Sequence, residues 1–127
     1  MTNQDWGIVL FAHGSRDPLW RAPIDAVAQA IARQAPGQTV RCAFLELTTP
    51  DLPTVVDELV GQGLRALRIV PMFLGVGRHA REDLPELVAQ LRQKHPALAL
   101  DLLPPVGEHP AMTALIAQIA LDSSLIS

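Results

Sequence analysis

Four short stretches of this chain are almost continuously apolar, which is typical of strands buried on both faces of a parallel sheet. They cover residues 7–11, 39–45, 66–74 and 98–103. Pro71 lies inside the third stretch and has no amide hydrogen for a strand ladder. We therefore expect Pro71 near the end of its strand or at an irregularity.

Between and after these stretches, apolar residues recur with the spacing i, i+3, i+4, i+7, which places them on one face of a helix. Helices are predicted from Trp20 to Gln34, from about Leu52 to Gly61, from about Ala80 to Lys94, and from Pro110 onward. The four apolar faces are Ile24/Val27/Ala28/Ile31, Val55/Val56/Leu59/Val60, Leu84/Leu87/Val88/Leu91 and Met112/Leu115/Ile116/Ile119. All four faces are expected to pack in the core.

The resulting order, strand and helix in alternation, predicts an α/β fold with a parallel sheet and right-handed crossovers. We expect one three-layer α/β/α domain with a four-stranded parallel sheet in the order 2-1-3-4. A chain of 127 residues is enough for one ordinary domain. The domain is assigned to residues 1–127, with its core at about 7–121.

Composition and charge narrow the function. The hydrophobic fraction is 49%, which can bury a real core, and the formal net charge of -3 with no long basic run argues against nucleic acid. The single cysteine, Cys42, excludes a disulfide framework and a CxxC site, and we interpret it as a small core residue. The longest apolar run, residues 69–77, is too short to span a membrane, and the N-terminus has no signal-peptide pattern, so a cytoplasmic location is expected.

Ligands of open parallel sheets bind beyond the carboxyl ends of the strands. Three of the four histidines, His13, His79 and His109, lie in loops predicted at that edge, and Glu46 lies there too. Structural roles remain open: His13 could cap the first helix, Glu108-His109-Pro110 could be only a helix start, and Arg16 and Arg78 could be surface charges. His95 lies at a helix C-terminus on the opposite edge and is expected to be structural or solvated.

Several familiar motifs are absent or misplaced. The sequence has no GxxxxGK phosphate-binding loop and no GxSxG nucleophile motif. Residues 75–80 match the dinucleotide pattern GxGxxA, but they follow the third strand, and the nearest acidic candidate, Asp101, lies within the fourth. A histidine phosphatase is disfavoured because Ala12, not arginine, precedes His13.

Four segments carry a resemblance to a known family: FAHGSRDPLWRAP (11–23), AFLELTTPDLP (43–53), VPMFLGVGRHAREDLP (70–85) and PPVGEHPAM (104–112). Together they resemble the small CbiX-type chelatases, which are sirohydrochlorin cobaltochelatases with related ferrochelatases. The resemblance runs from about Gly7 to Ala120. It implies the class II chelatase fold, corresponding to one half of the longer two-domain enzymes, and pairing as a homodimer around a shared cleft.

The activity that the resemblance implies is ATP-independent insertion of Co²⁺, or alternatively Fe²⁺, into sirohydrochlorin for cobalamin or siroheme. His13 and His79 would be the catalytic residues and the metal ligands, with His13 also accepting a proton. The macrocycle would contact a larger set: Glu46, Leu74, Gly75, Val76, Gly77, Arg78, Ser15 and Arg16. No tightly bound cofactor is expected, since the metal is a substrate.

The residue chemistry points the same way. Imidazole suits borderline metals such as Co²⁺ and Fe²⁺, and two histidines make an incomplete shell from which a metal can leave. A neutral imidazole can accept one of the two pyrrole protons that metal insertion displaces. Arg16, Arg78 and Arg81 could bind the carboxylates of the macrocycle. Two alternatives stay open: a non-catalytic tetrapyrrole or metal carrier, and a small dinucleotide-binding domain.

Overall fold

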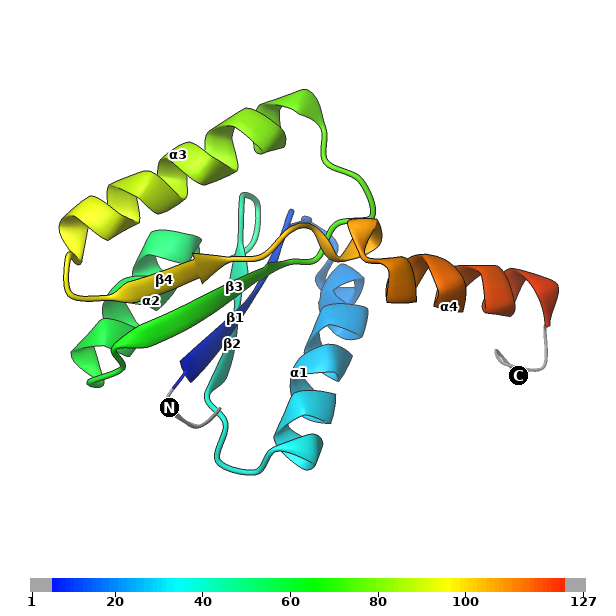
Figure 1. Ribbon diagram of the computed structural model, residues 1–127, viewed down its shortest axis with the longest axis horizontal. Coiled ribbons are helices and arrows are strands. Elements are labelled where there is room, and N and C mark those ends of the chain that lie inside the picture. Colours follow the sequence, from blue (N-terminus) through cyan, green and yellow to red (C-terminus); the bar gives the residue numbers. More distant parts are fainter. Residues whose placement is uncertain (1–5, 123–127) are drawn as a thin grey trace.

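The computed structural model describes residues 6–122 and contains a four-stranded parallel sheet (Figure 1). The strands are β1 (Trp6–Ala12), β2 (Val40–Phe44), β3 (Ala66–Pro71) and β4 (Ala99–Leu102). Their order in the sheet is β2-β1-β3-β4, with every neighbouring pair parallel. The predicted fold class and strand order are confirmed.

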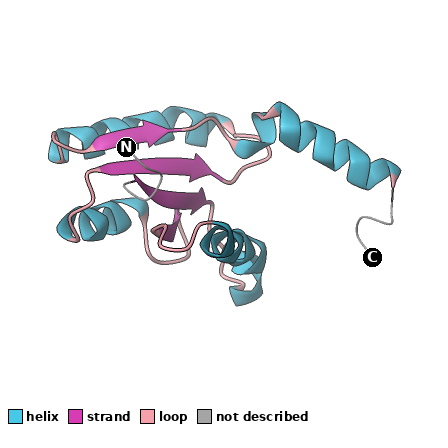
Figure 2. Ribbon diagram, turned by 60° about the horizontal axis from the view of Figure 1, so that its bottom comes forward, coloured by secondary structure: helices cyan, strands magenta, loops and turns pink. Residues whose placement is uncertain are grey.

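Helices cover both faces of the sheet, which makes three layers (Figures 1 and 2). The helices are α1 (Ala22–Gln34), α2 (Leu52–Gly61), α3 (Arg78–Lys94) and α4 (Pro110–Leu121), with short 3-10 turns η2 (Pro18–Arg21) and η3 (Val106–Glu108). Helix α1 packs on β1 and β2 from one side. Helices α2 and α3 pack on the other side.

Alternation along the strands divides the core into two clusters, one on each face of the sheet. Toward α2 and α3 point Val9 and Phe11 of β1 and Leu67 and Ile69 of β3, all 0–1% exposed. On the α1 side lies a smaller cluster, in which Leu10, Ala12 and Phe44 of the strands pack with Ile24 of α1 and partly buried neighbours. Each fully buried large side chain stabilises the fold by about 1.5–3 kcal/mol relative to its exposed state.

Helix starts and ends follow local chemistry. Asp51 caps α2, where its Oδ1 accepts a hydrogen bond from the Thr54 amide at 2.9 Å. Hydrogen bonding by the Thr54 side chain, and then by its amide, lowers the pKa of the Asp51 carboxyl. At the C-terminal end of α3, Lys94 Nζ donates a hydrogen bond to Asp57 of α2, and His95 Nε2 pairs with the same carboxyl, each at 2.8 Å. These two partners hold the pKa of Asp57 below its usual value. The predicted structural role of His95 is confirmed.

Several predicted boundaries differ from the structure. Strand β3 ends at Pro71, three residues earlier than predicted. Helix α3 begins at Arg78 rather than near Ala80. Helix α1 begins at Ala22 because Pro18–Arg21 form a 3-10 turn, capped where Asp17 Oδ1 accepts from the Leu19 amide at 2.9 Å.

The prediction for α4 is wrong in one important respect. Its apolar face was expected in the core, yet against the described residues 6–122 no residue of α4 is buried. Leu115 is 48% and Ile116 43% exposed. The helix leaves the domain at the carboxyl edge of the sheet and extends away from it (Figures 1 and 2). Amphipathic spacing predicted the helix correctly but carries no information about what the helix packs against.

Candidate active site

The loops at the carboxyl edge prolong the hydrogen bonding of the sheet. Beyond β1 and β2, the amide of Leu45 donates to the carbonyl of Ala12 at 2.9 Å, and that of Glu46 to the carbonyl of His13 at 3.0 Å. On the other side, Met72 donates to Phe11 at 2.7 Å and Gly107 donates to Phe73 at 2.9 Å. The backbone at His13, Glu46 and Phe73 is therefore held by hydrogen bonds that continue the sheet.

Gly14 is required where these two loops meet. Its φ is +101°, a conformation that side-chain-bearing residues rarely adopt. A Cβ atom there would lie 1.6 Å from the carbonyl oxygen of Glu46. The close approach of the two loops therefore requires a residue without a side chain at position 14. The position of His13 beside Glu46 depends on this close approach.

His13 follows directly on β1 and is exposed. Its ring lies against the ring of Phe73, with centroids 4.3 Å apart. Phe73 is 2% exposed, so the imidazole rests on a core side chain while its other surface faces solvent. The alternative that His13 caps the first helix is not observed, since Asp17 caps the turn η2.

His79 is the second residue of α3 and is exposed. Its neighbour Arg78 makes an exposed pair with Glu82, Nε to Oε1 at 3.3 Å, so the surface-charge interpretation of Arg78 holds in this structure. A Cβ atom on Gly75 or Gly77 would meet no protein atom within 4 Å. Packing therefore does not require these two glycines, and they leave open space beside His79.

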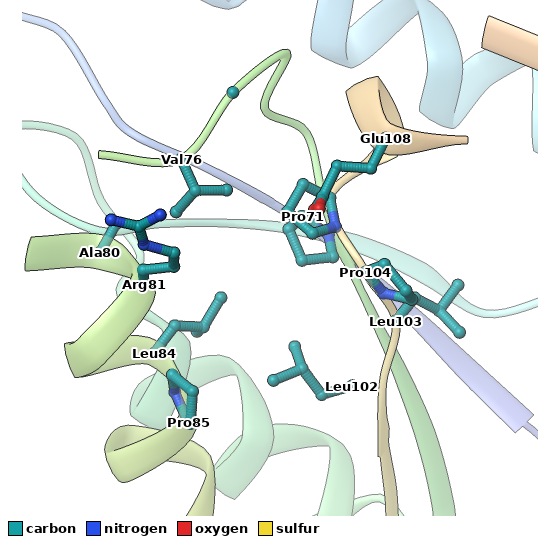
Figure 3. A pocket seen from close by; sticks show the side chains of 12 residues that line it. Pro71, Val76, Ala80, Arg81, Leu84, Pro85, Leu102, Leu103, Pro104 and Glu108 are labelled. Atoms are coloured by element: carbon teal, nitrogen blue, oxygen red, sulfur yellow. The ribbon is translucent and has the colours of Figure 1, made fainter. Parts of the chain in front are cut away.

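A cleft of about 510 Å³ lies between the first turns of α3 and the ends of β3 and β4 (Figure 3). Its lining is mostly apolar: Pro71, Gly75, Val76, Ala80, Leu84, Pro85, Leu102, Leu103, Pro104 and Pro105, with Arg81 and Glu108 as the charged members. Gly75 and Val76 were predicted to contact a substrate, and both line this cleft. Leu74 lies beside it and is 71% exposed.

A smaller hollow of about 320 Å³ lies on the other side of α3, lined by Phe11, Leu45, Ala80 and Leu87 among others. Ala80, next to His79, therefore contacts both hollows. The first turns of α3 stand between two open spaces instead of packing fully on the sheet. Pro85 lies inside this helix and supplies no amide hydrogen to the carbonyl of Arg81 one turn earlier.

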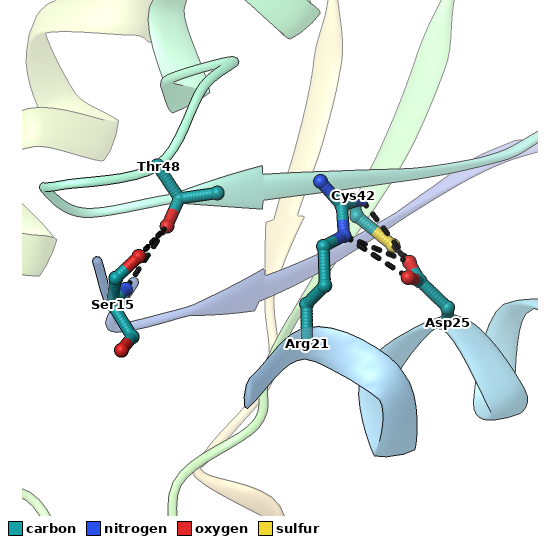
Figure 4. A network of polar contacts seen from close by, with 5 residues as sticks. All are labelled: Ser15, Arg21, Asp25, Cys42 and Thr48. Atoms are coloured by element: carbon teal, nitrogen blue, oxygen red, sulfur yellow. Dashed lines mark hydrogen bonds and ion pairs between the residues drawn. The ribbon is translucent and has the colours of Figure 1, made fainter. Parts of the chain in front are cut away.

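Ser15 and Thr48 join the two loops a second time (Figure 4). The amide of Ser15 donates to Thr48 Oγ1 at 2.9 Å, and the Thr48 hydroxyl donates to the Ser15 carbonyl at 2.8 Å. Ser15 was predicted to contact substrate. In the structure its backbone links the two loops through Thr48. Arg16 is exposed, and no side-chain partner for it is found among residues 6–122.

Figure 4 also shows a polar cluster under this region. Arg21 binds Asp25 with two nitrogens, the shortest contact being 3.0 Å, and its guanidinium lies 4.8 Å from the ring centroid of Phe44. Cys42 Sγ lies 3.9 Å from Asp25 Oδ1. Burial and the nearby Asp25 raise the pKa of the Cys42 thiol, which agrees with a core role and not with a reactive thiolate.

The histidines fall into two groups by their hydrogen bonding. His95 Nε2 pairs with Asp57, and His109 Nδ1 accepts from the Ala111 amide at 3.0 Å as the cap of α4. The interpretation of His109 as a helix start is confirmed. The rings of His13 and His79 make no hydrogen bond to any other residue in the described range 6–122. No group of three or more His, Cys, Asp or Glu side chains within that range could hold a metal ion by itself.

Two residues near the site had no place in the predicted set. Phe73 was assigned to a strand, and its contact with His13 could not be inferred from strand alternation. Gly107 packs so closely that a Cβ atom would lie 1.9 Å from the carbonyl oxygen of Leu74. The short spacing Pro-Pro-Val-Gly marks a tight loop, which was the available signal for Gly107.

Asp101, the acidic candidate for dinucleotide binding, lies 3.9 Å from Arg68 within the sheet.

Comparison with known proteins is consistent with this geometry. The family model CbiX matches residues 7–123. A sirohydrochlorin cobaltochelatase from Methanococcoides burtonii is 33% identical over 82 residues, which is 65% of this chain and 63% of that protein. One from Methanothermobacter thermautotrophicus is 32% identical over 82 residues, 65% of this chain and 57% of that protein. The matched segment thus spans about three fifths of these relatives.

Solved structures share the fold. A structure described as a cobalamin (vitamin B12) biosynthesis CbiX protein from Marinobacter aquaeolei VT8 has a TM-score of 0.81 at 30% identity, covering 96% of this chain and 99% of that one. The sirohydrochlorin chelatase SirB from Bacillus subtilis subspecies spizizenii, in complex with cobalt, has a TM-score of 0.76 at 24% identity. This chain aligns over 92% of its own length with 50% of SirB. In the described residues 6–122 no helix is long and apolar enough to cross a membrane.

Proposed function

Because this chain belongs to the CbiX family, we propose that it is a chelatase that inserts a divalent metal into sirohydrochlorin without ATP. The metal is a substrate of the reaction, with Co²⁺ as the first candidate. Relatives that match 65% of this chain are sirohydrochlorin cobaltochelatases, and this similarity supports the choice of substrate.

One observation carries the proposal. Of the four histidines, His13 after β1 and His79 in the first turn of α3 have rings without a hydrogen-bonding partner in the described chain. His95 and His109, in contrast, have structural partners. Both belong to the carboxyl edge, where α/β folds bind ligands. Imidazole nitrogens that no protein group occupies are available to a metal ion.

The residue set fits transient metal binding. A structural zinc site uses four protein ligands, and the described chain offers no group of three. His13 and His79 would hold the incoming ion, and its remaining positions would be open to water and then to the macrocycle. Each insertion replaces two pyrrole N–H protons by one M²⁺, and a neutral His13 would accept one of them.

The cleft beside α3 would hold the macrocycle. Its apolar walls, Val76 among them, suit the face of a flat ring, and the open space at Gly75 and Gly77 leaves room for that ring. Arg81 lines the cleft and has no side-chain partner among residues 6–122, so it is available to a substrate carboxylate. Glu46, Leu74, Arg78, Ser15 and Arg16 complete the proposed contacts from neighbouring loops.

Finer features remain proposals. Fe²⁺ is the alternative metal, and siroheme the alternative pathway. We propose a homodimer in the cytoplasm as the working form. Two imidazoles bind Co²⁺, Fe²⁺ and Ni²⁺ with little discrimination.

The decisive experiment follows the macrocycle absorbance during incubation of the purified chain with sirohydrochlorin and Co²⁺. We expect multiple turnovers for the wild type, and a loss of at least 100-fold in rate for His13→Ala and for His79→Ala. His109→Asn, which keeps a capping side chain on α4, is the matched control and should retain activity. Stoichiometric binding of sirohydrochlorin without turnover would identify a carrier and overturn the proposal, as would full activity in the double histidine variant.

A further inference from the structure

The exposed large apolar side chains of this protein gather at one edge of the sheet. Apart from those of α4, the ones found within residues 6–122 are Leu19, Leu45, Leu47 and Leu74, which are 39–80% exposed. Leu19 follows β1, Leu45 and Leu47 follow β2, and Leu74 follows β3, so all four lie at the carboxyl edge. A single exposed leucine is ordinary on a protein surface, but a group confined to the ligand-binding edge is typical of a binding surface.

Leu47 differs from the other three leucines in its backbone conformation. Its φ is +64°, and within residues 6–122 no other residue except glycine has a positive φ. The Thr48 amide donates a hydrogen bond to the Glu46 carbonyl at 2.7 Å, across Leu47. A hydrogen bond that spans a single residue with positive φ closes the rare and strained type of γ-turn. Backbone strain is thus placed at an exposed leucine.

This strain brings no gain in packing. Glycine and asparagine adopt a positive φ at lower cost than leucine does. The side chain of Leu47 is 56% exposed, and it belongs to neither core cluster of the described residues. The stability of the fold alone therefore favours glycine at position 47. Strained residues that the fold does not require cluster at active sites and ligand clamps.

The neighbours of Leu47 are fixed to the loop that carries His13. On one side, the Glu46 amide donates to the His13 carbonyl at 3.0 Å. On the other side, Thr48 Oγ1 accepts from the Ser15 amide at 2.9 Å and donates to the Ser15 carbonyl at 2.8 Å (Figure 4). These bonds hold the turn from both ends. They maintain the strained conformation and fix Leu47 relative to His13.

The strand order places Leu47 and the α3 cleft on opposite sides of His13. In the sheet order β2-β1-β3-β4, Leu47 follows β2, His13 follows β1, and the cleft lies at the ends of β3 and β4. Strands β2 and β4 are three spacings apart, about 14 Å at 4.8 Å per spacing. One ligand that contacts both sides of this edge must therefore be wide, and a macrocycle has that shape.

We propose that Leu47 contacts the apolar face of the macrocycle on the side of His13 away from the α3 cleft. The inference rests on the proposed function and deepens it, because it adds a substrate-contacting residue to the same site. A ring centred near His13 and His79 extends past the cleft toward β2, where Leu47 offers an apolar contact. Covering this side chain removes apolar surface from water, and the γ-turn has already fixed its position when the ligand arrives.

The test compares stability with sirohydrochlorin affinity in Leu47→Gly. Glycine relieves the strain and removes the apolar contact, so the two quantities should separate. We expect a melting temperature equal to or above that of the wild type. The dissociation constant for sirohydrochlorin, titrated by macrocycle absorbance without metal, should be at least tenfold higher. In the chelation assay KM should rise by a similar factor while kcat changes less. Leu47→Met, which keeps an unbranched apolar side chain, should recover most of the lost affinity.

Gly63→Leu is the matched control. Gly63 has a φ of +96°, and it lies between α2 and β3 at the opposite edge of the sheet. A Cβ atom on Gly63 would meet nothing within 4 Å. This variant therefore introduces a leucine with positive φ far from the site. It should lower the melting temperature and leave the dissociation constant for sirohydrochlorin unchanged.

Two results would overturn the role of Leu47. One is a dissociation constant for Leu47→Gly within twofold of the wild-type value, including a variant that changes only its molar mass in solution. The other is a fall in the melting temperature of Leu47→Gly as large as that of Gly63→Leu, because Leu47 would then be a packing residue of the fold.

The two proposals can fail separately. If sirohydrochlorin binding weakens in Leu47→Gly but the wild type shows no turnover, the chelatase activity is removed and the contact stands. Turnover by the wild type, with the same KM in Leu47→Gly, would have the opposite meaning. A wild type that neither binds sirohydrochlorin nor inserts Co²⁺ would end both.

Discussion

The imidazole of His13 lies against the ring of Phe73, with 4.3 Å between centroids and 34° between planes. Phe73 also contacts Phe11 edge-on, at 6.0 Å and 70°. A chain of aromatic contacts thus runs from the buried strand β1 to an exposed side chain of the proposed site. The core therefore restricts the orientation of the proposed metal ligand directly.

Replacing Phe73 by leucine should weaken metal binding as well as the fold. We expect Phe73→Leu to lower the free energy of unfolding by about 1–2 kcal/mol and to reduce Co²⁺ affinity several-fold, because the imidazole loses the surface it rests on. Calorimetric titration with Co²⁺ measures the affinity. Phe44→Leu is the control, since Phe44 is equally buried but contacts Trp20 in the other cluster. Equal loss of affinity in both variants would contradict the positioning role of Phe73.

Gly14 and Gly63 allow a matched comparison. Their φ values are +101° and +96°, but a Cβ atom on Gly63 would meet nothing within 4 Å, whereas one on Gly14 would collide with the Glu46 carbonyl. Gly63→Ala should cost about 1 kcal/mol for the backbone conformation alone. Gly14→Ala should cost clearly more, and it should also impair metal insertion because the loops of His13 and Glu46 separate. Urea unfolding of both variants gives the comparison, and similar costs would argue against the close approach.

Acid should weaken the contact between α2 and the end of α3. Lys94 and His95 hold the pKa of Asp57 below its usual 3.8, so the charged carboxyl contributes stability above that pH and loses it as the pH falls through the lowered value. Asp57→Asn should therefore be less stable than the wild type at pH 6, and the difference should shrink below about pH 4. Because Asp57 is exposed to solvent, the effect is modest. Urea unfolding midpoints across this pH range measure the stability difference, and Glu86→Gln is the control. A difference between Asp57→Asn and the wild type that does not change with pH would contradict the lowered pKa of Asp57.

Arg81 should affect substrate binding rather than chemistry. It lines the α3 cleft, and none of the side chains in residues 6–122 pairs with it. Arg81→Gln should raise KM for sirohydrochlorin about tenfold, as expected for the loss of one charge-assisted hydrogen bond, with kcat changed less. Arg33→Gln, on the exposed last turn of α1, is the control. An unchanged KM would place the carboxylates of the substrate elsewhere.

Much of the fold could be predicted because local and global signals agree. The apolar stretches predicted four strands, and the helical faces of α1, α2 and α3 proved to pack against the sheet as expected. Pro71 was correctly placed near the end of its strand, where it became the last residue of β3. Proline chemistry fixes a local position, so it can be deduced from sequence.

The site was only partly accessible to the same reasoning. Topology placed His13, Glu46 and His79 at one edge of the sheet, because the ends of parallel strands share an edge. The contact between Phe73 and His13 depends on how residues 72–74 turn away after Pro71, which no periodicity records. The exposed position of α4 was missed for a related reason: its pattern shows that a face is apolar but not which molecule covers it.

The backbone ladder that continues past the strands into residues 44–46, 72–73 and 107 has a thermodynamic consequence. The conformational entropy of these segments is lost when the chain folds, not when a ligand arrives. Binding then requires ordering of only a few side chains and the displacement of water, so a weakly held ion can be captured and released quickly. Under the proposed function, in which the metal leaves the protein in every cycle, such early ordering allows fast exchange without a loss of geometric definition.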